Sequence, residues 1–262
     1  MNSIIRSIRE RFLGFGVYIN RTPDIKVIKD FVSELSPVKT EHRLIRVGGD
    51  ADGGYLIPDD LVGITQCFSP GVSNIANFEI DLTARGIECF LADYSVEKPP
   101  FLNELMHFEK KFLGSENDDV YMTLGNWMSR YSKTDGDLIL QMDIEGSEYE
   151  VIYELQRETL LRFRIIVIEF HRLDNLFNKS GFDLIKLTFR KLLKDFSIVH
   201  IHPNNCSPPI ASGDLEIPPV LEFTFLRNDR IAHREPQIEF PHPLDRPNVS
   251  EVANYKLPRC WY

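Results

Sequence analysis

A succession of short apolar runs, rich in β-branched residues, constrains this chain more than any other feature of its sequence. Most of these runs are followed by apolar residues at helical spacing, and strands that alternate with helices form a parallel sheet covered on both faces. We expect strands over residues 63–68, 87–92, 137–142, 164–170, 197–202 and 221–226, with a weak one at 111–113. We expect helices over residues 74–86, with Asn74 as N-cap, and over 102–109, 147–155 and 183–193. The sequence therefore predicts an α/β fold.

The last two expected strands differ from the others because no helical pattern separates them. The intervening residues 204–219 are rich in Pro, Ser and Asn, so we predict an antiparallel hairpin at one edge of the sheet. We expect one domain over residues 1–262. It would consist of a helical extension (1–40), a core (44–227) and a proline-rich tail (234–262) that wraps the surface or a neighbouring subunit of a homo-oligomer.

Composition excludes several classes of protein. The formal net charge of -9 argues against a nucleic-acid partner held through phosphate contacts. No apolar run is long enough to span a membrane, and the first residues lack the apolar stretch of a secretory signal. The 4 cysteines show no CxxC spacing, so we expect a reduced, cytoplasmic protein without a zinc site.

The first forty residues contain two apolar stripes at helical spacing. Ile5, Ile8 and Phe12 share one face beside several arginines, and residues 25–35 form the second stripe. We expect both helices to pack on the domain or on a partner subunit. A basic amphipathic helix lying on an anionic membrane is the alternative.

Polar residues gather where the expected strands end. They are Gly71 and Ser73, Asp93, Asp143, and the pair Glu169 and His171. In an open parallel sheet, ligands bind outside the carboxyl ends of the strands. We therefore expect a cleft built from these residues.

The turn after the first strand indicates which cofactor this cleft accepts. Residues 68–73, which include Ser69 and Gly71, lack two of the three glycines of a dinucleotide fingerprint. A pyrophosphate needs close backbone N–H groups, whereas S-adenosylmethionine has no phosphate and needs one tight turn. Asp93, at the end of the second strand, is placed to accept both ribose hydroxyls.

Three motifs resemble one known family. Asp143-Ile144-Glu145-Gly146-Ser147-Glu148 follows an apolar strand and leads into a helix; residues 71–79 and 167–171 supply the other two. Together they resemble the FkbM-type O-methyltransferases over roughly residues 44–227. The chain departs from that family in its N-terminal helices and its tail. A further departure, the run 52–55 that ends in Tyr55, would lie across the cofactor.

The resemblance implies a Rossmann-like class I methyltransferase sheet and S-adenosylmethionine as cofactor. It also implies a role for each matching position. Gly71 and Ser73 would line the methionine portion, Glu79 would reach its amino group, and Asp93 would hold the ribose. The adenine would lie between Tyr94, Thr123 and Leu124, and Asp143 would lie near the transferable methyl. The family's usual acceptor is a hydroxyl, often on a sugar or a polyketide-like product. We expect a sugar hydroxyl, of a nucleotide-linked sugar or a surface polysaccharide precursor.

An alcohol is a weak nucleophile, so its methylation needs a general base or a metal ion. His171 is the preferred base because its ordinary pKa lies nearest neutrality, and Asp143 is the second choice. A magnesium ion between Asp143 and Glu169 is an alternative.

Glu169, His202 and Asn204 are candidates for positioning the acceptor. We expect His200 to point away from His202, in a core or surface role. Two other functions stay open: a nucleotide-sugar or NAD-dependent oxidoreductase, and an inactive methyltransferase fold that serves as a binding subunit.

Overall fold

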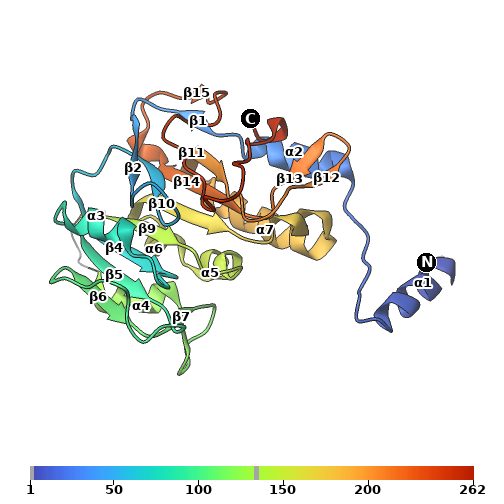
Figure 1. Ribbon diagram of the computed structural model, residues 1–262, viewed down its shortest axis with the longest axis horizontal. Helices are drawn as coiled ribbons and strands as arrows, with labels where there is room; N and C mark the ends of the chain where they lie inside the picture. The colour runs from blue at the N-terminus through green and yellow to red at the C-terminus, as the bar shows by residue number, and fades with distance from the viewer. Residues whose placement is uncertain (1–2, 133–135) are drawn as a thin grey trace.

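A seven-stranded sheet forms the centre of the computed structural model, which describes residues 3–132 and 136–262 (Figure 1). Its strands lie in the order β11-β14-β10-β9-β4-β5-β6. Their bounds are β4 Ile64–Pro70, β5 Glu88–Ala92, β6 Met106–Glu109, β9 Asp137–Met142, β10 Phe163–Phe170, β11 Phe196–Pro203 and β14 Leu221–Arg227. The helices are α1 Ser3–Leu13, α2 Ile25–Glu34, α3 Asn77–Thr83, α4 Leu124–Tyr131, α5 Glu148–Glu154, α6 Arg157–Leu160 and α7 Lys179–Leu192.

The sheet is parallel except for one strand. β4, β5, β6, β9 and β10 pair in parallel, whereas β14 pairs antiparallel with both β10 and β11. β14 therefore lies inside the sheet, and β11 forms its edge. This arrangement confirms the predicted mostly parallel α/β sheet, and the antiparallel pair ends it because residues 204–220 supply no crossover helix.

Apolar side chains cover both faces of the sheet, as two core clusters. The first contains residues of α2, α4, α5 and α7, with Phe68 and Ile166 from the sheet. The second contains Phe78 of α3, Cys67 and Val167, together with the hairpin of β2 (Leu44–Val47) and β3 (Tyr55–Pro58). All eight residues of β10 are buried, which explains why this strand is apolar almost throughout.

Two helix predictions were wrong in type or bounds. Residues 102–109 contain the strand β6, not a helix, because Met106–Glu109 pair with β5 while Leu102 and Leu105 are exposed. Asn74 does not cap α3; the cap is Ala76, three residues after the left-handed Ser73 (φ 44°). The left-handed conformation of Ser73 shows that the turn after β4 continues past this residue, so α3 begins only at Asn77.

Four short strand pairs lie outside the central sheet among the described residues, and the β2–β3 hairpin is one of them. The predicted weak strand is present as β7 (Phe112–Leu113), but it pairs with β8 (Tyr121–Met122). β12 (Ile210–Ser212) pairs with β13 (Leu215–Ile217), within the segment that joins β11 to β14. β1 (Val38–Lys39) pairs with β15 (Glu235–Pro236), which ties the tail to this chain's own body.

The two N-terminal helices differ in their surroundings. α2 packs through Ile28, Phe31 and Val32 into the first core cluster. α1 extends away from the body (Figure 1), and Ile8 and Phe12 on its apolar face are exposed. The expected packing on the domain is therefore confirmed for α2. α1 does not pack on the domain, and its packing on a partner subunit or an anionic membrane stays a prediction. No helix within the described residues is long and apolar enough to cross a membrane.

The C-terminal tail wraps over the domain. Its last helical turn, η3 (Arg259–Trp261), inserts Trp261 into the first core cluster, where the side chain is fully buried. The Trp261 indole Nε1 donates a hydrogen bond to the carbonyl of Glu216 (3.0 Å). The tail therefore follows the first of the two predicted courses, over the surface of its own chain.

Candidate active site

A cavity of about 520 Å³ opens beyond the carboxyl ends of β4, β5 and β9. This is the edge of the sheet where ligands bind in open α/β folds. Its walls come from the loop before β3, the loop after β4, α3, the β7–β8 pair and the loop after β9. The residues that line it include Asp52, Tyr55, Gly71, Ser73, Glu79, Asp93, Ser95, Phe112, Tyr121, Gln141, Asp143 and Glu145.

Two loops meet at the floor of this cavity with almost no space between them. Gly71 has φ of 90°, and a Cβ placed on it would lie 1.5 Å from the carbonyl oxygen of Asp143. Only glycine permits this approach. Ser73 (φ 44°) and Glu145 (φ 59°) also adopt the left-handed conformation. Backbone strain is thus concentrated at the cavity, as is typical of functional sites.

The wall of the cavity is strongly acidic. It contains five carboxylates, those of Asp52, Glu79, Asp93, Asp143 and Glu145, and no lysine or arginine among the described residues that line it. Burial raises the pKa of Asp143 to about 7, against the opposing attraction of His171. The buried Oδ1 of Asp143 has no hydrogen-bond partner within the described chain. The cavity therefore favours a cationic ligand and disfavours a phosphate.

Asp93 connects the loops that follow β4 and β5. Its Oδ2 accepts a hydrogen bond from the Ser73 N–H (2.8 Å), and its Oδ1 accepts bonds from the N–H (2.7 Å) and hydroxyl (2.6 Å) of Ser95. The carboxylate is thereby held at the cavity wall in a fixed orientation.

A buried hydrogen-bonded chain lies beneath the cavity. The Ser69 hydroxyl bonds Glu79 and donates to Gln141 Oε1 (2.6 Å), and Gln141 Nε2 donates to the Tyr55 hydroxyl (3.2 Å). Ser69 has one hydrogen and two acceptor partners, so a protonated Glu79 would satisfy the chain by donating to Ser69. Burial raises the pKa of Glu79 to about 7, outweighing the opposing effect of the Ser69 hydrogen bond.

His171, directly after β10, lies among four carboxylates. Its Nδ1 is 3.0 Å from Glu148 Oε1, and its Nε2 lies 3.4 Å from Glu145, 3.5 Å from Glu169 and 3.8 Å from Asp143. Burial lowers the pKa of His171, but the hydrogen bond and charge of Glu148, with Asp143 and Glu145, outweigh it and raise this pKa above 6.5. His171 is brought to the strand ends but is not among the residues lining the cavity.

Glu148 orients this histidine. The same Glu148 oxygen accepts from the N–H groups of Ile144 (3.2 Å) and Gly146 (3.0 Å), and the side chain is fully buried. It therefore fixes the loop after β9 and, in a neutral imidazole, places the proton on Nδ1 and leaves Nε2 as the acceptor.

The candidates for acceptor binding lie farther along the strand ends. Glu169, Glu222 and His202 are directly opposite one another on β10, β14 and β11, so they form one row. Asn204 Nδ2 donates to Glu169 Oε1 (3.0 Å). Burial raises the pKa of Glu169 well above its usual range, and the charges of Asp143 and Glu222 raise it further. None of Glu169, His202 and Asn204 lines the cavity.

Three residues expected to flank an adenine lie elsewhere. Leu124 is fully buried in the core, and Thr123 caps α4 by accepting from Asn126 N–H. Tyr94 is half exposed and packs on Phe112, with ring centroids 5.4 Å apart. The aromatic residues that do line the cavity on this side are Phe112 and Tyr121, because the β7–β8 pair extends over it.

The structure differs from the expectation for His200. This side chain points to the same side as His202, because residues two apart on a strand share a face, and both approach Asp245. At the cavity, Asp143, Glu145 and His171 form a group with metal-ligand spacing, whose donor atoms lie within 4.8 Å of one another. The expected magnesium pair of Asp143 and Glu169 stays a prediction; Glu169 Oε1 accepts from Asn204, and its Oε2 has no hydrogen-bond partner within the described chain.

Sequence reasoning missed two residues that organise the site. Gln141 is the one polar side chain inside the apolar run of β9, and that exception was a usable signal. Glu148 stands inside the Asp143–Glu148 motif, but its role is set by a bond to His171, 23 residues away.

Comparison with protein families identifies this region. Residues 106–196 match the family model described as the methyltransferase FkbM domain. This part of the chain is similar to the FkbM methyltransferase domain. The match extends from β6 to the start of β11 and contains Asp143, Glu148, Glu169 and His171, so the predicted resemblance is confirmed for these residues.

Two other comparisons complete the picture. A search of curated proteins gave no match. Among solved structures, the chain is similar to one in the crystal structure of a fibrillarin/Nop5p complex, at 11% identity and a TM-score of 0.38. That similarity covers 63% of this chain and 73% of the other.

Proposed function

We propose that this FkbM-type methyltransferase uses S-adenosylmethionine to methylate a hydroxyl group. The observation that carries the proposal is the acidic cavity at the strand ends, with five carboxylates and no basic residue among the described residues that line it. S-adenosylmethionine bears a sulfonium and an ammonium, whereas NAD bears two phosphates that need basic or N–H-rich surroundings. A cavity of about 520 Å³ lies within the size range of cofactor sites.

The residues of the cavity fit this cofactor. Asp143 has a buried oxygen without a hydrogen-bond partner. This oxygen would accept a hydrogen bond from the ammonium group of the methionine portion, and Glu79 would lie close to the same group. Asp93 would hold the ribose hydroxyls, and Gly71 and Ser73 would line the methionine portion. Phe112 and Tyr121, in place of Tyr94, Thr123 and Leu124, would flank the adenine.

When bound, the cofactor supplies an electrophilic methyl group for direct displacement by an oxygen nucleophile. The acceptor hydroxyl must lose its proton as it attacks, and His171 Nε2 is the proposed base. Glu148 holds the imidazole by its Nδ1 (3.0 Å) and stabilises the imidazolium that forms. Asp143 remains the second candidate.

We propose a sugar hydroxyl as the acceptor, on a nucleotide-linked sugar or a polysaccharide precursor. Sugars are recognised by buried carboxyl and amide groups, and Glu169 with Asn204 supplies such a pair (3.0 Å) next to His171. Glu222, directly opposite Glu169 on β14, extends this buried polar row beyond the residues that line the cavity. We further propose that residues 1–262 act as one domain, since α2 and η3 contribute to the same core cluster as the sheet.

Calorimetry separates this proposal from its rivals. We expect S-adenosylmethionine and S-adenosylhomocysteine to bind the wild-type protein and NAD not to bind. Asp143→Asn should weaken donor binding at least about tenfold, whereas Asp119→Asn, on an exposed loop, should not. NAD binding without S-adenosylmethionine binding would overturn the cofactor assignment.

Turnover requires a second measurement. Transfer of a labelled methyl group to a panel of nucleotide-sugars and glycans should be abolished by His171→Ala with little change in donor affinity. Unchanged turnover would remove His171 as the base. Donor binding without transfer to any hydroxyl acceptor would favour an inactive binding subunit. Dependence of transfer on added Mg²⁺ would instead favour an ion at Asp143, Glu145 and His171.

A further inference from the structure

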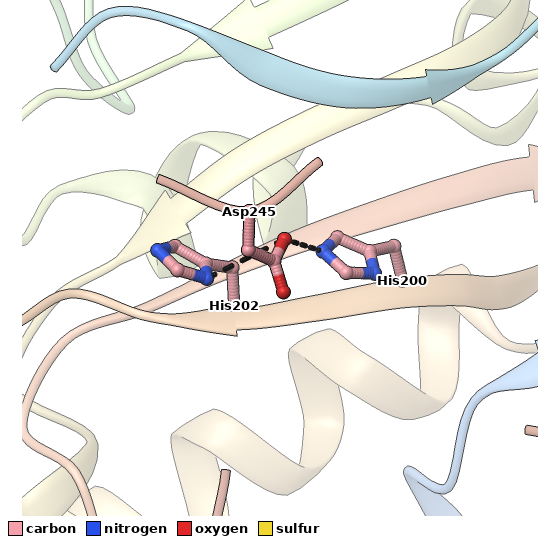
Figure 2. Close-up of side chains that lie close together, drawn as sticks. All are labelled: His200, His202 and Asp245. Atoms are coloured by element: carbon pink, nitrogen blue, oxygen red, sulfur yellow. Dashed lines mark hydrogen bonds and ion pairs between the residues drawn. The ribbon is translucent and has the colours of Figure 1, made fainter. Parts of the chain in front are cut away.

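A second cluster of metal-ligating side chains lies at β11, an outer strand of the central sheet, and is independent of the proposed methyl transfer. His200 and His202 project from the same face of β11, and Asp245 reaches between their rings from the C-terminal tail (Figure 2). The side chains are 2%, 4% and 2% exposed, respectively. Three residues of metal-ligand types are thus buried together, from two segments far apart in the sequence.

The donor atoms have the spacing of a coordination site. Asp245 Oδ1 lies 2.9 Å from His200 Nε2 and 3.6 Å from His202 Nδ1, and all three donor atoms lie within 4.8 Å of one another. Ligands about 2.0–2.1 Å from a tetrahedral zinc are separated from one another by about 3.3 Å. The two measured distances bracket that value.

The histidines are incompletely satisfied by the protein. His202 has no hydrogen-bond partner for either ring nitrogen within the described chain, and His200 Nδ1 has none. A buried nitrogen without a hydrogen-bond partner destabilises the folded protein. The His200–Asp245 bond alone leaves His202 unexplained, because that ring faces the same carboxylate oxygen at 3.6 Å.

The carboxylate is also held in place. Asp245 Oδ2 accepts a hydrogen bond from the His242 N–H (2.8 Å), which leaves Oδ1 directed at the two imidazoles. Support of a ligand by a neighbouring donor is a regular feature of protein metal sites.

We propose that His200, His202 and Asp245 bind a divalent transition-metal ion, of which Zn²⁺ is the representative. Two imidazoles with one carboxylate suit Zn²⁺ and its neighbours better than Mg²⁺ or Ca²⁺, which prefer oxygen ligands. Three protein ligands leave a fourth position for water. No cysteine takes part, so the absence of CxxC spacing does not bear on this site.

The ion has a structural role in this arrangement. It joins β11 to the tail at a point where no strand pairing holds residue 245. Near this point, Asn248 donates to Glu222 (2.7 Å) and to Asp52 (3.3 Å), and Asp52 lines the acidic cavity. Loss of the ion should therefore loosen the tail and, through Asn248, the wall of that cavity.

The test uses the protein over residues 1–262, stripped with a chelator and titrated with Zn²⁺ alone. We expect one equivalent to bind at this site, and Co²⁺ in its place to give the visible absorption of a low-coordinate site. Asp245→Asn and His202→Gln should each weaken binding by more than about 100-fold. His233→Gln, a change on the exposed surface, should leave it unchanged.

Two controls keep the outcome decisive. His171→Gln removes a donor from the cavity group, so the proposal requires the Zn²⁺ affinity to survive it. Asp245→Asn must match the metal-free wild type in circular dichroism, and Zn²⁺ should raise the melting temperature of the wild type only. Absence of Zn²⁺ binding to the wild type, or full binding by folded Asp245→Asn and His202→Gln, would establish an ordinary buried ion pair and overturn the site.

Discussion

Glu79 is a carboxyl group that the fold buries beneath the cavity, and its replacement tests the electrostatics of the site directly. Its pKa is about 7, raised by burial from an ordinary value of 4.5. A folded-state pKa above the unfolded value means that the folded protein holds the proton more tightly. The associated stability is present below pH 4.5 and is lost as pH rises through 7.

The size of the effect follows from these two values. At about 1.4 kcal/mol per pKa unit, ionisation of the buried carboxyl costs about 3 kcal/mol of stability above pH 8, and most of this appears between pH 5 and 8. Glu79→Gln cannot ionise and keeps an oxygen toward Ser69. The difference in free energy of unfolding, variant minus wild type, should therefore increase by about 2–3 kcal/mol from pH 5 to pH 8.

Urea unfolding at several pH values, without cofactor, measures this difference. Because the comparison is between pH values, any constant effect of the amide cancels, and the titration of Asp143 is common to both proteins. Glu150→Gln, on the exposed side of α5, is the matched control and should give parallel curves. Parallel curves for Glu79→Gln would refute the reasoning, because they would mean that Glu79 ionises in the folded protein as readily as in the unfolded chain.

Three other substitutions test separate parts of the structure. Gly71→Ala places a Cβ 1.5 Å from the Asp143 carbonyl oxygen and should abolish donor binding in calorimetry, whereas Gly86→Ala, with φ 78° and open space, should cost only about 1 kcal/mol of stability. Glu148→Gln should reduce kcat at least about tenfold and leave donor affinity intact. Because Glu148 raises the pKa of His171, its loss should lower that pKa and move the acidic limb of the pH–rate profile to lower pH. A structural role alone would leave that limb in place. Trp261→Ala should lower the free energy of unfolding by about 3–5 kcal/mol in urea, since the indole is fully buried; a loss below 1 kcal/mol would mean that the tail is not part of the core.

The parts of the fold that the sequence predicted are those governed by local burial. β9 and β10 were recognisable because nearly every residue in them is buried. The helix predicted over residues 102–109 was wrong. Leu102, Leu105 and Met106 have helical spacing, but only Met106 is buried. The segment contains a strand because it pairs with β5. Pairing with a distant strand is not a property that local periodicity reveals.

The candidate site shows the same division. Gly71, Asp93 and Asp143 each come directly after a parallel strand (β4, β5 and β9), so the topology of the sheet alone places them at one cavity. The β7–β8 pair, which contributes Tyr121, depends on a loop whose course has no sequence signature. Asp245 meets His200 from 45 residues away, in a proline-rich segment that predicts only a surface course. The shared face of the two histidines could have been deduced from their spacing.

Two buried carboxyl groups whose ionisation is unfavourable line the cavity, where a bound cation would stabilise their ionised forms. Asp143 and Glu79 are buried carboxyl groups whose pKa values stand near 7 because burial outweighs the attraction of His171 for Asp143 and the hydrogen bond of Ser69 to Glu79. A cation bound against them stabilises their ionised forms, so it lowers both pKa values and displaces protons near neutral pH. By linkage, donor affinity must rise as pH increases through 7, over the same interval in which the ligand-free fold loses stability. The acidity of the cavity, costly to the ligand-free protein, would thus be the source of selectivity for the proposed cofactor, S-adenosylmethionine.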